Sequence, residues 1–279
     1  MKNLIYVNCG LFLALKVINV FFILAGAGGN VYPAILEWLA VPASVPHLLS
    51  CPWSLVSYMF VHIEFFHLLF NMLWLYWFGS FFLNYFSQRQ LTGVYLMGGI
   101  WGAFLYISAY NLFPYFESAR FSSWAIGASA SVMAIVFAVC TYIPQHKVYI
   151  FLVGPVKLIY LALFTAFIDL LSIPYDNPGG HIAHLGGAMF GWMFIQGIRK
   201  NRDLTAGVVY LLQKIEKLFH SQKRIKVKYR KGGAGMNSQA NQTHNKKTEE
   251  ERINVILDKI SKSGYESLTK EEKEILFKR

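Results

Sequence analysis

Two side chains that can carry out acyl transfer stand at the beginning of apolar segments. Ser129 lies in residues 127–131 (GASAS), ahead of an apolar run that reaches Tyr142, and His184 opens another run over residues 183–192. Polar groups at membrane depth are costly unless they pair or face water, so they indicate a functional site. A serine hydroxyl is a weak nucleophile until an adjacent base takes its proton. We therefore expect Ser129 to act as nucleophile and His184 as general base of a hydrolase working inside a membrane.

A second polar pair, His67 and Asn71, lies at the start of a different apolar segment. The two residues are four apart, so they share one face of a helix. An imidazole and an amide placed there can donate hydrogen bonds to the oxyanion that forms during attack on a carbonyl. Polar residues in membrane helices also bond to neighbouring helices, which is the alternative interpretation. Because the chain also holds Ser129 and His184, we favour an oxyanion hole.

The composition predicts an all-α polytopic membrane protein. Hydrophobic residues make up 55% of the 279 residues, aromatic residues 16%, and the mean hydropathy is +0.38. Apolar runs of roughly 17 to 25 residues can cross a bilayer as helices. Six candidate spans are found, at residues 4–24, 65–86, 91–110, 126–143, 148–173 and 183–198. The first apolar run lacks the features of a cleavable signal peptide, so we expect it to stay in the protein.

Basic residues in the connections indicate how the spans are oriented. Lys2, Arg89, Lys147 and the cluster at residues 199–202 fall on one side, while the connections on the other side hold Arg120 as their basic residue. Lys and Arg are enriched in cytoplasmic loops. We therefore predict that both termini are cytoplasmic and that the site, at the opposite ends of its spans, opens to the outer side.

The carboxyl-terminal part has a different character and carries most of the net charge of +11. Residues 199–279 hold 20 of the 26 basic residues. We divide it into a basic amphipathic juxtamembrane segment, 199–231, a flexible Gly-rich linker, 232–248, and a short helical tail, 249–279, after a membrane domain at 1–198. The basic segment is predicted to contact anionic lipid headgroups. Nucleic acid is not expected, because no recognition fold accompanies it. In the tail, Thr269 and Glu272 fit a capping box.

The spaced motifs resemble the signature segments of the rhomboid family of intramembrane serine proteases, in the same order along the chain. The matching positions are His62, His67, Asn71, residues 127–130, His184, Gly187 and Gly191. The resemblance covers residues 1–198 and implies a six-transmembrane-helix rhomboid-like bundle with a small helical cytoplasmic tail. It implies a catalytic dyad of Ser129 and His184. It also implies an oxyanion hole made of the Ser129 amide with the side chains of His67 and Asn71.

Several further residues are assigned supporting roles or are left open. Gly127, His62, His181 and Gly187 are expected to support the site. His181 either helps retain water or substrate, or forms a structural hydrogen bond. Asp169, in the fifth predicted span, either orients His184 as a third member or makes a structural bond, which we favour. The chain departs from the family pattern at Ala130, where many members have Gly, and at Met133, where an aromatic residue is common. Ser131 is an alternative nucleophile, but its spacing from Gly127 makes Ser129 the favoured one.

The expected function is that of a serine endopeptidase cleaving peptide bonds in or next to transmembrane segments of protein substrates, in a bacterial cytoplasmic membrane by resemblance. No cofactor and no metal are expected. Three cysteines, Cys9, Cys51 and Cys140, have no metal-type spacing. One alternative is a catalytically inactive rhomboid-like protein that binds transmembrane helices. Less favoured are a transporter, for which no internal repeat is evident, and a metalloprotease. Its ligands would be His62, His67, His181 and His184.

Overall fold

The computed structural model describes residues 1–26, 31–150, 153–219, 253–264 and 267–277. The chain divides into two compact units, Met1–Gln222 and Lys223–Arg279, and each is described here by itself. The first unit is a bundle of helices with two small antiparallel strand pairs. It holds every residue that the sequence assigned to the site.

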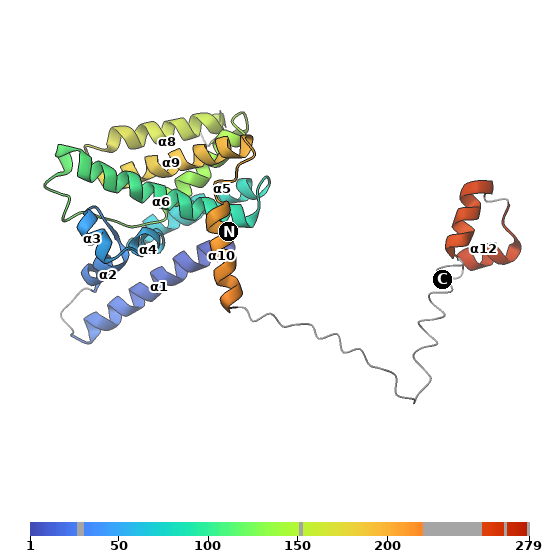
Figure 1. Cartoon of the computed structure of the whole chain (residues 1–279), viewed down its shortest axis with the longest axis horizontal. Helices are drawn as coiled ribbons and strands as arrows, with labels where there is room; N and C mark the ends of the chain where they lie inside the picture. Colours follow the sequence, from blue (N-terminus) through green and yellow to red (C-terminus); the bar gives the residue numbers. More distant parts are fainter. Residues whose placement is uncertain (27–30, 151–152, 220–252, 265–266, 278–279) are drawn as a thin grey trace. The chain divides into compact units, whose positions relative to one another are not determined.

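Helices in the first unit have the following bounds: α1 Lys2–Leu24, α2 Tyr32–Leu39, α3 Val45–Ser50, α4 Ser54–Ser57, α5 Phe65–Leu83, α6 Gln88–Leu112, α7 Ser129–Tyr142, α8 Leu158–Ser172, α9 Pro178–Arg199 and α10 Ala206–Phe219. Two 3-10 helices, Tyr58–Phe60 and Pro114–Phe116, lie in the connections. The strands are β1 Val41–Pro42, paired with β2 Trp124–Ala125, and β3 Lys147–Ile150, paired with β4 Gly154–Lys157. Helix α9 packs against α6, α7 and α8, and Figure 1 shows α6, α8 and α9 running alongside one another.

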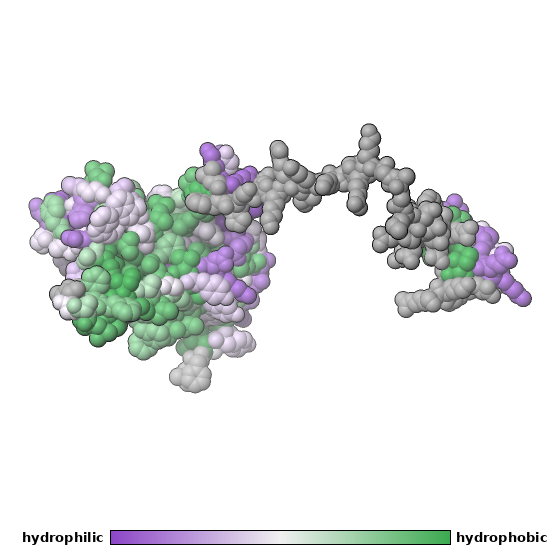
Figure 2. All heavy atoms as spheres, turned by 90° about the horizontal axis from the view of Figure 1, so that it is seen from below, coloured by the Kyte–Doolittle hydropathy of each residue, from purple (hydrophilic) through white to green (hydrophobic). Residues whose placement is uncertain are grey.

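The surface of this unit is strongly apolar, as expected of a membrane protein. Among the described residues, α1, α5 and α6 are long and apolar enough to cross a membrane, and α7 and α8 are apolar but shorter. Many large hydrophobic side chains are exposed. Figure 2 shows hydrophobic residues covering much of one face of the unit, with hydrophilic residues gathered toward its edges. The six-span count remains a prediction.

The fifth predicted span differs most from the structure. Its expected beginning, at residue 148, lies in the β3–β4 hairpin, and the helix α8 starts only at Leu158. Gly154, at the start of β4, has a φ of +89°, a backbone conformation that glycine adopts easily. The helix of the sixth predicted span, α9, begins at Pro178, five residues earlier than predicted. The Asn177 side chain accepts a hydrogen bond from the Gly180 amide there, and proline suits a first helical turn.

Glycines let the central helices approach closely. A Cβ atom added at Gly187 of α9 would press against the carbonyl oxygen of Ala130, and one at Gly191 against that of Ala134. Because Ala130 follows Ser129 directly, this contact of α9 with α7 lies beside the predicted nucleophile. Small residues at membrane-helix interfaces commonly permit such an approach.

The second unit contains a helix at residues 253–263 and α12, Lys270–Phe277. The capping box is confirmed: the Glu272 amide donates to the Thr269 hydroxyl over 3.3 Å, and the Thr269 amide donates to the Glu272 carboxylate over 2.8 Å. The ammonium group of Lys259 lies 2.9 Å from the Glu272 carboxylate and lowers the pKa of that group. The linker, 232–248, and residues 220–231 of the basic segment lie outside the described residues.

Candidate active site

Ser129 is the first residue of α7, and the turn before it is held in place by hydrogen bonds that its backbone amides donate. Gly127 has a φ of +112°, and its amide donates to the carbonyl of Tyr58 over 2.8 Å. The amide of Ala128, the N-cap, donates to Nε2 of His62 over 3.3 Å. The first amides of a helix have no internal partner and carry partial positive charge. Ser129 therefore places its hydroxyl and its amide where negative charge is stabilised.

His184 lies on α9 and is oriented by a carboxylate from the neighbouring helix. Its Nδ1 atom is 2.9 Å from Oδ1 of Asp169, which lies on α8 and is buried. His181, one turn earlier on α9, brings its own Nδ1 to 2.7 Å from the same oxygen. A carboxylate accepts both bonds, so the protons lie on Nδ1 and the Nε2 atom of His184 is free to accept one.

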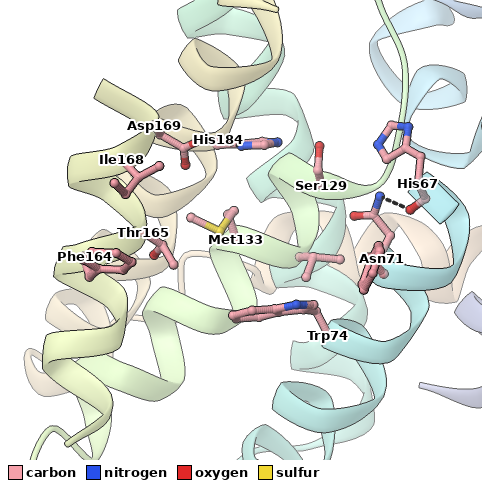
Figure 3. Close-up of a pocket in the computed structure, with 12 residues that line it drawn as sticks. His67, Asn71, Trp74, Ser129, Met133, Phe164, Thr165, Ile168, Asp169 and His184 are labelled. Atoms are coloured by element: carbon pink, nitrogen blue, oxygen red, sulfur yellow. Dashed lines mark hydrogen bonds and ion pairs between the residues drawn. The ribbon is translucent and has the colours of Figure 1, made fainter. Parts of the chain in front are cut away.

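Ser129 and His184 line a common cavity of about 410 Å³ between α5, α7, α8 and α9. Figure 3 shows the His184 imidazole extending toward the Ser129 hydroxyl, with Met133 on the side of the cavity below them. Among the hydrogen bonds of the described residues none joins the two side chains. Catalytic hydrogen bonds often become short only once substrate is bound. The remaining lining is mostly apolar and includes Phe70, Trp74, Val132, Phe164, Thr165 and Ile168.

A second cavity, of about 500 Å³, shares three lining residues with the first. His67, Ser129 and His184 line both cavities. The second is more polar, with Glu64 and Asn177 among its lining residues, and it lies where α5, α7 and α9 begin. The candidate nucleophile and base thus stand between an apolar pocket and a polar hollow. Such a site can hold an apolar segment on one side and admit water on the other.

His67 and Asn71 lie on the facing helix, α5, and project toward Ser129 (Figure 3). A Cβ atom at Gly127 would come within 2.9 Å of Nε2 of His67, so the imidazole rests against the turn that precedes the nucleophile. The Asn71 amide group donates one hydrogen bond to the His67 carbonyl over 2.9 Å. His67, Asn71 and Ser129 therefore line the same cavity, with the two donor side chains on the helix that faces the beginning of α7.

His62 has a different position from the other histidines. It is fully buried and belongs to the lining of neither cavity. Burial, together with the nearby His67, lowers its pKa to about 4. The ring is therefore neutral near pH 7 and can accept the hydrogen bond from Ala128. Its contribution is to hold the beginning of α7 rather than to face substrate or water.

The arrangement bears on the metalloprotease alternative. In the part of the chain that the structure describes, the group of metal-type ligands that comes together is Asp169, His181 and His184, with atoms within 4.8 Å of one another. His62 and His67 are outside this group, so the predicted set of four histidines does not assemble. Hydrogen bonds to Asp169 already account for both Nδ1 atoms.

The structure places the Asp169 carboxylate against His184 and His181, a contact that the spacing of 15 residues between Asp169 and His184 does not reveal, and the choice between an orienting and a structural bond stays a prediction. The signal that could have identified it was an acidic residue inside an apolar segment. The apolar wall formed by Trp74, Phe164 and Ile168 carried no signal beyond hydrophobicity. Ser131, the alternative nucleophile, is fully buried and absent from both cavity linings.

The fold and the site define a helical membrane protein with a serine and a histidine at a shared cavity. Residues 50–201 match the Rhomboid domain family, and the chain belongs to the rhomboid family. Residues 240–278 match a separate family of unknown function, DUF6576.

Named relatives come from animals and a plant. The chain is 34% identical over 160 residues to the human presenilin-associated rhomboid-like protein, mitochondrial, covering 52% of this chain and 38% of the relative. It is 31% identical over 145 residues to the Danio rerio presenilin-associated rhomboid-like protein A, mitochondrial, covering 49% and 35%. It is 28% identical over 158 residues to the Arabidopsis thaliana RHOMBOID-like protein 12, mitochondrial, covering 53% and 47%. The matches thus span less than half the length of these relatives, whose names give no support to a bacterial membrane.

Proposed function

We propose that this protein is an intramembrane serine endopeptidase in which Ser129 is the nucleophile and His184 the general base. The observation that carries the proposal is that both side chains line the same two cavities while Asp169 holds His184 by Nδ1. Membership of a family that includes serine proteases supports it. A serine hydroxyl, a free imidazole nitrogen and a set of hydrogen-bond donors at one point are the groups that acyl transfer needs.

The reaction proceeds in two halves. Ser129 Oγ attacks a peptide carbonyl carbon as His184 Nε2 takes the hydroxyl proton, and the carbonyl oxygen becomes an oxyanion near the Ser129 amide and the side chains of His67 and Asn71. His184 then gives the proton to the leaving amine as the C–N bond breaks. Water, activated by the same imidazole, hydrolyses the acyl-enzyme and restores the serine.

The substrate class follows from the two cavities. A transmembrane helix hides its carbonyls in internal hydrogen bonds, so it must unwind locally to be cleaved. The apolar pocket between α5 and α8 suits the unwound segment, and the polar hollow suits water. We propose that both termini are cytoplasmic and that the hollow opens to the outer side, since basic residues gather in the connections on the side of the termini. A bacterial cytoplasmic membrane is proposed from the family resemblance of the sequence alone. The basic segment 199–231 is proposed to contact anionic lipid headgroups.

The test is cleavage of a panel of single-span substrates by the purified protein in liposomes, together with labelling by a serine-reactive fluorophosphonate. Ser129→Ala and His184→Ala are expected to abolish labelling and to reduce cleavage by about 10⁴-fold or more. Ser131→Ala is the matched control, since it removes a hydroxyl two residues away that is buried and without a hydrogen-bond partner. It is expected to label and cleave as the unaltered protein does.

Three outcomes would contradict the proposal. Cleavage that persists in Ser129→Ala excludes this nucleophile. Activity that is lost on adding a chelator and restored by zinc points to the metalloprotease alternative. A folded protein that binds transmembrane helices but neither labels nor cleaves any substrate of the panel supports the inactive rhomboid-like alternative.

A further inference from the structure

We propose that Asp169 is a positioning residue for His184, so that the site works as a serine–histidine–aspartate arrangement and His181 anchors the aspartate. This inference rests on the proposed function and deepens it. The family resemblance implies a dyad, whereas this chain brings a buried carboxylate to the second nitrogen of its general base.

The geometry assigns each nitrogen a task. Oδ1 of Asp169 accepts from Nδ1 of His184 over 2.9 Å, which fixes both the tautomer and the rotation of the ring. The Nε2 atom is then unprotonated and directed toward the cavity that contains Ser129, as Figure 3 shows for the ring as a whole. Without this bond a neutral imidazole could also carry its proton on Nε2, where it could not act as a base.

Charge adds to the effect of orientation. During attack His184 gains a proton and becomes an imidazolium, with the Asp169 carboxylate already beside it. Opposite charges attract more strongly in an apolar interior than in water. The groups facing the carboxylate from the helix packed on it are His181 and His184, both through Nδ1. The carboxylate thus stabilises charge that develops in the transition state.

His181 completes the arrangement from the same helix. Its Nδ1 atom lies 2.7 Å from Oδ1 of Asp169, so the carboxylate is held between two imidazoles one turn apart on α9. His181 belongs to neither cavity lining, whereas His184 belongs to both. Its task is therefore to keep the aspartate in place, and changing it affects the reaction only through Asp169.

The experiment measures kcat and KM separately for the full chain in liposomes with a single-span substrate. Asp169→Asn keeps the size of the side chain, but its amide can donate to Nδ1 and so favours the wrong tautomer. It is expected to lower kcat by about 10²- to 10⁴-fold while KM stays within about twofold, because only a transition-state interaction is lost. Fluorophosphonate labelling should slow in parallel.

Companion variants separate positioning from folding. Asp169→Glu keeps the charge and is expected to recover part of the kcat lost in Asp169→Asn. His181→Asn is expected to lower kcat by less than tenfold. Ser172→Ala, three residues from Asp169 on α8, is the matched control and should equal the unaltered protein. A merely structural role predicts instead a rise in KM, a lower melting temperature and no recovery with glutamate.

The outcomes distinguish this inference from the function on which it rests. Unaltered protein that cleaves, alongside Asp169→Asn with kcat within threefold of it, overturns the inference alone. Unaltered protein that neither cleaves nor labels overturns the proposed function and the inference together. If Asp169→Asn does not fold, Asp169→Glu is measured in its place, and a folded Asp169→Glu protein with a raised KM and an unchanged kcat overturns the positioning role.

Discussion

At the scale of single residues, the beginning of α7 depends on the protonation state of one buried histidine. His62 accepts the Ala128 amide through Nε2, and only the neutral ring has an acceptor there. Its ring lies edge-on to that of His67, with centroids 5.1 Å apart, so charge on both would be repulsive. Burial and this neighbour lower the pKa of His62 to about 4. The turn that presents Ser129 is therefore built for a neutral imidazole.

The stability of the protein should consequently depend on pH through His62. Its folded pKa of about 4 lies below the unfolded value of about 6.5, so the unfolded chain binds the proton more tightly between these values. Stability from this group is fully present above pH 6.5, falls as the pH drops toward 4, and then levels off. The shift corresponds to about 3 kcal/mol. Thermal unfolding in detergent at pH 7.5 and 4.5 should show a smaller loss for His62→Gln than for the unaltered protein. Equal losses would contradict the assignment.

At the scale of elements, the distance between two helices decides whether the reactive groups meet. Ser129 and His184 are carried by α7 and α9, and the two helices touch where Gly187 faces the Ala130 carbonyl. A protein interior is close-packed, so an added methyl group there must move a helix or bend it. Because His184 is one turn from Gly187, such a movement also displaces the imidazole.

We expect Gly187→Ala to lower both stability and activity. Overpacking of this kind costs about 1–3 kcal/mol. A displacement of roughly 1 Å at the base can lower the rate by about 10²-fold. Gly10→Ala is the matched control, since a Cβ at Gly10 of α1 meets nothing within 4 Å. Melting temperature and cleavage rate should fall in Gly187→Ala and stay unchanged in Gly10→Ala. Normal cleavage by a stable Gly187→Ala protein would show that the close approach is dispensable.

The helices and strands also show which parts of the fold the sequence could predict. Apolar runs located α1 and α5 to within a few residues, because length and hydrophobicity suffice for a span. The β3–β4 hairpin was missed, since residues 148–153 are apolar enough to extend the run that becomes α8. The contact between Asp169 and His184 could not be predicted for a related reason, because it depends on how α8 and α9 pack and sequence spacing alone does not fix that.

At the scale of the whole molecule, the chain joins two compact units of different character. Residues 1–198 hold 5 acidic and 6 basic residues, whereas residues 199–279 hold most of the charge. The Rhomboid domain match, 50–201, falls within the first unit, and the match to the family of unknown function, 240–278, falls within the second. Every residue of the candidate site and both of its cavities belong to the first unit. The chemistry should therefore not require the second.

Ending the chain after Gln222 should leave cleavage of a single-span substrate within about twofold of the full chain, because no group that binds or activates the carbonyl is removed. The kcat and KM of both forms are measured in liposomes of the same composition, with Ser129→Ala in each form as the blank. The truncated form should also keep its melting temperature, since the units have separate cores, with Ile256 and Leu268 buried in the second. A truncated form that is folded and binds fluorophosphonate normally but cleaves more than tenfold more slowly would contradict this expectation. That result would assign the second unit a part in substrate capture.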